Sequence, residues 1–147
     1  MSSILVHHHL GLGDHIMCHG IIREYAKRYH KVGLFSHAHN YPSVAFMFRD
    51  LPNVTVIKGN DDFARAYIKE NQEKNGPEKY DEVKTIGFEN LDRTSGELLE
   101  RQFYKTAGVD LHKIWTGFYV DRDFTKEKNL FQTSAPKTDY VFIHEDT

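Results

Sequence analysis

A glycine-containing loop, Leu10-Gly11-Leu12-Gly13-Asp14-His15, holds the residues whose types and spacing are best suited to chemistry. Gly11 and Gly13 lack a Cβ, so the backbone can turn sharply and approach a ligand closely. A helix that begins after such a loop presents unpaired N–H groups to a phosphate or another oxyanion. Asp14 is placed to take a proton from an attacking hydroxyl. Two alternatives stay open: a strand-to-helix turn that binds nothing, and Asp14 as a carboxylate that stabilises the helix N-terminus.

The loop does not match either of the common nucleotide-binding fingerprints. In the dinucleotide fingerprint a third glycine follows three residues after the second, and here that position is Ile16. The second predicted strand ends in Ser36-His37, where an acidic residue would bind the ribose hydroxyls. No Gly-Lys-Ser/Thr follows the loop, so it is not a P-loop either. We therefore predict neither a nicotinamide nor another resident cofactor.

The chain has ten histidines, of which three are consecutive at His7-His8-His9. In a strand, His7 and His9 point to one face and His8 to the other, so the triplet does not converge on one metal ion. The single cysteine cannot form a Cys-x-x-Cys pair. We predict no metal site, with zinc as the alternative, and assign the histidines to pocket walls or to a hydrogen-bonded core. The residues that we predict to bind ligand are His9, Gly11, Gly13, His15, His37 and His144.

Strands and helices must alternate along the chain to position these residues. Apolar and β-branched runs predict strands at 4–9, 31–37, 53–58, 83–86, 115–120 and 140–145. Helical spacing and cap residues predict helices at 16–29, 40–51, 61–68, 94–107 and 125–132. Thr94 and Glu97 fit a capping box, and Gly108 fits a C-terminal cap. The alternation predicts a Rossmann-like, three-layer α/β/α fold with a doubly wound, mostly parallel sheet and ligands at the carboxyl ends of its strands.

Composition limits the location and the class of partner. The chain of 147 residues is long enough for one hydrophobic core, and its net charge of -2 gives no general attraction to nucleic acid or to anionic membranes. Cys18 is alone, so no intrachain disulfide forms and a reducing compartment is expected. The apolar stretch Ile4-Leu5-Val6 is too short for a secretory signal or a membrane span. We expect a cytoplasmic protein.

The segment His9-Leu10-Gly11-Leu12-Gly13-Asp14-His15-Ile16, followed by Gly20, resembles the start of the GT-B glycosyltransferases related to the ADP-heptose:lipopolysaccharide heptosyltransferases, glycosyltransferase family 9. In that family an aspartate in this turn is a proposed base toward the acceptor hydroxyl. The resemblance assigns this catalytic role to Asp14. It also implies an acceptor-side N-terminal domain, with most sugar-nucleotide contacts made by a second Rossmann-like domain.

On this basis we expect an acceptor-side domain over residues 1–137. Residues 138–147 are expected to be the first strand of a second domain or the last strand of the first. The partners would be a nucleotide-sugar donor and a glycan or other hydroxyl acceptor in a longer protein, and the 147 residues alone would be inactive. The alternative is a stand-alone Rossmann-like module that binds a phosphorylated metabolite without catalysis. An uncovered apolar face would also favour a homo-oligomer.

Overall fold

A computed structural model describes residues 2–73, 76 and 78–141. Its centre is a four-stranded sheet formed by β1 (Ser3–His7), β2 (Lys31–Ser36), β3 (Val54–Lys58) and β4 (Glu82–Thr85). All pairs are parallel and the strand order is β3-β2-β1-β4. Chain order therefore reverses at β1, because β2 and β3 lie on one side of it and β4 on the other. This confirms the predicted Rossmann-like fold with a parallel sheet.

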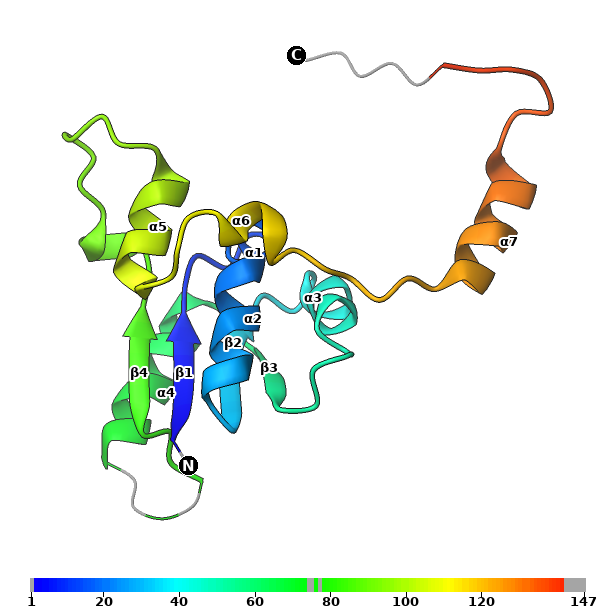
Figure 1. The fold of residues 1–147 in the computed structure, drawn as a ribbon. Helices are drawn as coiled ribbons and strands as arrows, with labels where there is room; N and C mark the ends of the chain where they lie inside the picture. The colour runs from blue at the N-terminus through cyan, green and yellow to red at the C-terminus, as the bar shows by residue number, and fades with distance from the viewer. Residues whose placement is uncertain (1, 74–75, 77, 142–147) are drawn as a thin grey trace.

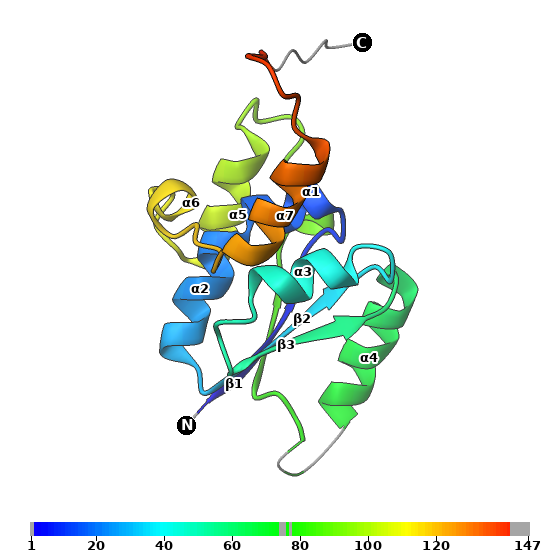
Figure 2. The ribbon, with the colours of Figure 1, turned by 90° about the vertical axis from the view of Figure 1, so that its right-hand side faces the viewer.

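Seven α-helices, and one 3-10 turn at Phe88–Asn90, accompany the strands in the described part of the chain. The α-helices are α1 (Leu12–Met17), α2 (His19–Arg28), α3 (Tyr41–Met47), α4 (Asp61–Glu73), α5 (Leu99–Ala107), α6 (Lys113–Thr116) and α7 (Phe124–Ser134). Figures 1 and 2 show α2 on one face of the sheet and α4 on the other, with α7 standing away from the remaining elements. None of the helices in the described residues is long and apolar enough to cross a membrane.

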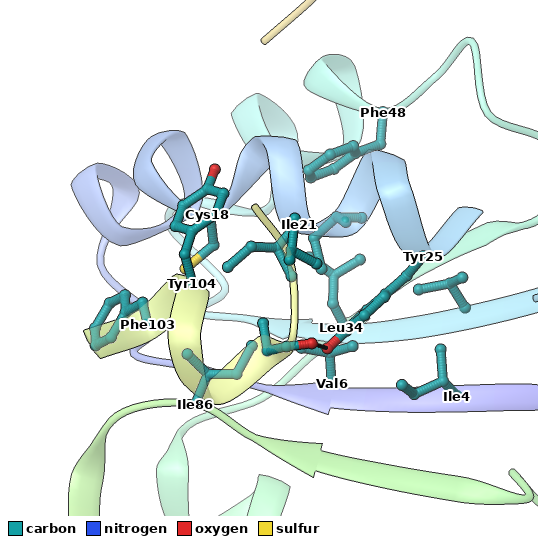
Figure 3. Close-up of a cluster of buried hydrophobic side chains, with 14 of the residues drawn as sticks. Ile4, Val6, Cys18, Ile21, Tyr25, Leu34, Phe48, Ile86, Phe103 and Tyr104 are labelled. Atoms are coloured by element: carbon teal, nitrogen blue, oxygen red, sulfur yellow. Dashed lines mark hydrogen bonds between the residues drawn. The ribbon is translucent and has the colours of Figure 1, made fainter. Parts of the chain in front are cut away.

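Alternating side chains of the buried strands divide the core between the two faces of the sheet. Ile4 and Val6 of β1 pack in the larger cluster with residues of α2, α3 and α5, whereas Leu5 packs in the smaller cluster with Ala64 of α4. Figure 3 shows the larger cluster, in which the buried hydroxyl of Tyr25 donates a hydrogen bond of 2.7 Å to a backbone carbonyl of α5. These two layers fix the edge at which the strands end.

Cys18 marks the largest departure from the predicted elements. One helix over 16–29 was expected, but the chain forms α1 and α2, with Cys18 between them in a non-helical conformation. The Cys18 side chain is fully buried, and burial raises the pKa of its thiol. The first helix also begins earlier than predicted, at Leu12 and not at residue 16, so Gly13 and Asp14 are helical residues.

Several predicted elements differ toward the C-terminal side. The helix expected from Thr94 begins at Leu99, because Asp92 binds the backbone of Thr94 and Ser95 and holds a turn there. Gly108 has the left-handed conformation predicted for a C-terminal cap. The strand predicted at 115–120 is wrong, since this region contains the end of α6 and an irregular connection. The helix predicted at 125–132 is confirmed as α7. Most of the strand predicted at 140–145 lies outside the described residues.

Candidate functional site

A polar cleft of 530 Å³ lies at the carboxyl ends of the strands. Its walls come from the segments after β1, β2 and β4 and from the first turns of α4. Parallel α/β sheets bind ligands in the crevice where strand order reverses, and here the segments after β1 and β4 meet at that crevice. The residues lining this polar cleft are His9, Leu10, Gly11, His37, Asp61, Arg65, Phe88, Glu89 and Arg93.

His9 is held in one orientation and one neutral tautomer. Its Nε2 accepts a hydrogen bond of 3.1 Å from the backbone N–H of Phe88, so the proton of the neutral ring resides on Nδ1. Nδ1 faces Asp14, with 3.9 Å between this nitrogen and Oδ1. Gly87 has a φ of 90°, and a Cβ there would lie 2.7 Å from Nε2 of His9. The turn after β4 therefore fixes the ring of His9 that faces Asp14.

The space beside Gly11 is filled by the carboxylate of Asp14. A Cβ on Gly11 would lie 2.6 Å from Oδ2 of Asp14, whereas the backbone angles of Gly11, φ -66° and ψ 150°, are open to any residue. Gly11 is also the N-cap of α1, and no side chain provides a cap hydrogen bond. Asp14 is thus not the capping residue, although a carboxylate in the first turn still interacts favourably with the helix dipole.

Replacing Gly11 by alanine should move the Asp14 carboxylate without unfolding the chain. The clash is with the end of a rotatable side chain, so we expect a change of less than about 0.5 kcal/mol in the free energy of unfolding. The ¹³C signal of the Asp14 carboxyl should shift in the NMR spectrum. Gly13→Ala is the matched control, because a Cβ on Gly13 meets nothing within 4 Å. An unmoved Asp14 signal in Gly11→Ala would contradict the described contact.

Charged groups from α4 and from the turn after β4 complete the polar cleft. Nε2 of the buried His7 lies 3.3 Å from Oδ1 of Asp61, and burial lowers the pKa of His7 despite the opposing influence of Asp61. The Arg65 guanidinium lies 5.8 Å from the centre of the Phe88 ring. Arg65 and Arg93 form no ion pair with any residue in the described part of the chain. Two cationic groups are therefore available to an anionic ligand.

These charged residues were missed by the sequence analysis. Asp61 was considered only as a possible cap of the helix predicted at 61–68, and the rule that ligands bind at strand ends would have drawn attention to it and to Phe88 and Glu89. Arg93 lies eight residues beyond β4, and no local pattern in the sequence indicates that it returns to the cleft.

The structure brings only some of the predicted ligand-binding residues together at the polar cleft. His9, Gly11 and His37 line the polar cleft, and the His37 ring stacks on His39 with 5.3 Å between ring centres. Gly13 faces away, toward an apolar groove. His15 is fully buried beneath the loop and does not form part of the cleft wall. His144 lies outside the described residues.

Burial keeps the histidines under the loop neutral. The rings of His8 and His15 meet edge to face at 4.6 Å, and neither ring nitrogen of His15 has a hydrogen-bond partner in the described structure. Burial lowers the pKa of His8 to about 4 and that of His15 to about 2. Such imidazoles neither carry charge nor exchange protons with a ligand near neutral pH.

A metal site receives no support from the residues that the structure describes. His15 and His19 have the four-residue spacing at which a continuous helix can present two imidazoles to one metal ion. The break at Cys18 places them in separate helices, and His19 instead stacks on Phe48. Within the described ranges no group of three or more His, Cys, Asp or Glu side chains is arranged to hold a metal ion.

The apolar groove lies on the other side of α1, between α1, α6 and the start of α5. It has a volume of 780 Å³. Its lining residues are Gly13, Ile16, Met17, Leu98, Glu100, Arg101, Leu111, Ile114, Trp115 and Phe118. Its apolar walls suit a protein side chain better than a sugar or a phosphate.

Comparisons with known proteins add no assignment to this geometry. No protein family, curated protein or solved structure was found to match the chain. The functional argument therefore depends on the polar cleft and on the pair formed by His9 and Asp14.

Proposed function

We propose that this chain is the acceptor-side domain of a GT-B glycosyltransferase and that Asp14 is its catalytic base. The observation that carries the proposal is the placement of the Asp14 carboxylate beside Gly11, which lines the polar cleft, with 3.9 Å between Nδ1 of His9 and Oδ1 of Asp14. A carboxylate beside a cleft at the carboxyl ends of parallel strands is suited to meet a bound hydroxyl.

In the proposed reaction the acceptor hydroxyl oxygen attacks the anomeric carbon of a nucleotide sugar. A new carbon–oxygen bond forms as the bond from that carbon to the diphosphate breaks, and the nucleoside diphosphate leaves with the bonding electrons. Asp14 takes the hydroxyl proton. His9 acts as a positioning residue, because its Nδ1–H is directed to the carboxylate while Phe88 fixes its other nitrogen. The donor is bound by a second domain in this proposal.

The charges of the polar cleft favour an acceptor with an anionic group. Arg65 and Arg93 are exposed cations on its wall, and guanidinium groups bind phosphate and carboxylate through charge-assisted hydrogen bonds. Asp61 and Glu89 lie on the same wall and can accept hydrogen bonds from sugar hydroxyls. We therefore propose a phosphorylated or acidic sugar as the acceptor.

Titration of the ¹⁵N-labelled chain with glucose 6-phosphate tests this proposal. Chemical shifts should change at Gly11, His37 and Arg93, and Arg93→Gln should weaken binding about 10-fold because one charge-assisted hydrogen bond is lost. Asp14→Ala should weaken glucose 6-phosphate binding about 10-fold but should not weaken binding of inorganic phosphate, which has no sugar hydroxyl for Asp14. UDP-glucose should bind no better than inorganic phosphate.

The second candidate is a module that binds a phosphorylated metabolite without catalysis. It is favoured by Arg65 and Arg93, which form no ion pair among the residues that the structure describes. For this module Asp14→Ala would change the affinities for phosphate and glucose 6-phosphate equally. Tight binding of UDP-glucose in the cleft, or sugar transfer from UDP-glucose by this chain alone, would contradict the proposal that this domain binds the acceptor and a second domain binds the donor.

A further inference from the structure

α7 is an isolated helix with an apolar surface. Asp123 caps it by accepting a hydrogen bond from the N–H of Lys126, but none of its residues is buried, and Figure 1 shows it apart from the domain. Phe124 and Phe131 are 68% and 61% exposed, and they lie on the same side because seven residues make two turns. A helix of 11 residues is marginal in water without tertiary contacts. We therefore expect the apolar side of α7 to pack against another protein surface.

The connection before α7 holds this helix away from the apolar groove of its own domain. Phe118 still lines the groove, and Arg23 binds the carbonyl of Tyr119 through Nε at 3.1 Å and Nη2 at 2.6 Å. Arg49, next to α3, then binds the backbone and the carboxylate of Asp121. The chain has thus left the groove three residues before α7 begins, on a path fixed by two arginines.

The apolar groove is complementary to α7, because its wall also exposes apolar side chains. Trp115 on its wall is 79% exposed, and Ile16 and Leu98 are also exposed, whereas soluble monomers seldom leave such contiguous apolar surface uncovered. We infer that α7 of one copy docks into the apolar groove of a second copy and that the second copy returns the same contact. This inference is independent of the proposed glycosyl transfer.

The available surface is sufficient for a stable dimer. Exposed aromatic side chains of the groove and of α7 are Trp115, Phe118, Phe124 and Phe131. At about 200 Å² for each complete side chain, their exposed parts amount to roughly 500 Å² in one copy. A reciprocal, two-fold contact would bury roughly 1,000 Å² from these aromatics, and the exposed Ile16 and Leu98 of the groove bring it to the size of specific interfaces. Both surfaces belong to one chain, so a second copy always supplies both partners.

Light scattering and sedimentation of the chain at 50 µM test the inference. We expect a dimer, and Phe131→Asp in α7 or Trp115→Asp in the groove should each weaken it at least about 30-fold, as loss of an interface hot spot does. Asn129→Asp is the matched control, because it adds the same charge on the opposite side of α7 and should leave the dimer intact. Far-UV circular dichroism checks that each variant remains folded.

Mixing the two disruptive variants gives the decisive result. Phe131→Asp keeps an intact groove and Trp115→Asp keeps an intact α7, so an equimolar mixture should form a heterodimer through one remaining contact. A monomeric wild-type chain at 50 µM would overturn the inference. A dimer that survives Trp115→Asp but not Phe131→Asp would also overturn it, because α7 would then pair with α7 and not with the groove.

Discussion

Acidification from pH 7 to pH 5 should lower the free energy of unfolding of this chain by about 5 kcal/mol. The largest contributions come from three buried histidines, His8, His15 and His19, and the buried His7, whose pKa is also lowered, adds to them. Domains of this size are stable by about 5–15 kcal/mol, so the loss is enough to unfold a chain of ordinary stability. We expect an acid transition centred between about pH 4 and pH 5.5.

The sign follows from the charge state of the buried rings. Burial lowers the pKa of His8 to about 4, of His15 to about 2 and of His19 to about 4, with the nearby charge of Arg23 adding to the shift of His19. In the unfolded chain each histidine titrates near 6.5. Below that pH the unfolded chain binds protons that the native chain excludes, so stability falls by up to about 1.4 kcal/mol per pH unit for each ring. For His8 and His19 the loss of stability ends near pH 4, where the native chain also binds the proton.

Carboxylates contribute little to the change in the free energy of unfolding between pH 7 and pH 5, because they titrate at lower pH. Arg23, for example, lowers the pKa of Asp50 below its ordinary value of 3.8, so this contribution to stability is present above 3.8 and is lost only below it. Urea unfolding at pH 5, 5.5, 6 and 7, followed by far-UV circular dichroism, therefore isolates the histidines. Trp115 is a poor probe since it is largely exposed in the folded chain.

A buried and an exposed histidine provide matched variants. His15→Leu removes two buried nitrogen atoms that have no hydrogen-bond partner, so it should raise stability at pH 7 by about 1 kcal/mol and reduce the pH slope by about a third. His112→Leu, at an exposed position, should leave the slope unchanged. If His15→Leu kept the full slope, His15 would not be a buried neutral group in solution.

Local sequence patterns predicted the alternating elements, and long-range packing accounts for most of what they missed. The apolar strand around Ile4–Val6 and the cap at Gly108 were predictable because residues within a few positions determine them. The break at Cys18 was not, since its neighbours continue a helical pattern while Tyr104, 87 residues from Met17 in sequence, binds the carbonyl of Met17. The helical periodicity of the residues around Cys18 gives no information about this long-range hydrogen bond.

The candidate site shows the same division. The loop containing Gly11 and Asp14 stood out because glycine and a carboxylate at a strand end have direct chemical uses. Arg65 and Arg93 did not, because each reaches the polar cleft from a separate segment, and only the order of the strands brings the two segments together. His15 shows the opposite error: its position beside the loop suggested a ligand contact, but helical geometry turns its ring into the core.

Gly20→Ala should be the most damaging of the conservative glycine substitutions, with a loss of about 2–3 kcal/mol in the free energy of unfolding. A Cβ on Gly20 would lie 2.2 Å from the carbonyl oxygen of Lys113 and 2.8 Å from the Tyr104 hydroxyl. Helix propensity favours alanine by about 1 kcal/mol, but it is outweighed because the opposing atom belongs to the backbone of α6. That carbonyl also accepts a hydrogen bond of 2.9 Å from the N–H of Gly117, so α6 must shift as a unit.

Gly13→Ala is again the control, since it gains the same helix propensity with open space around the new Cβ and should stabilise the chain by up to about 1 kcal/mol. Thermal unfolding of the two variants should therefore move in opposite directions, by about 3 °C for each kcal/mol. A melting temperature of Gly20→Ala at or above that of the wild type would contradict the close contact of α2 with α6. The opposite signs would also explain why a glycine follows the loop at position 20: its role is to admit α6, and with it the Trp115 wall of the apolar groove, rather than to contact a ligand.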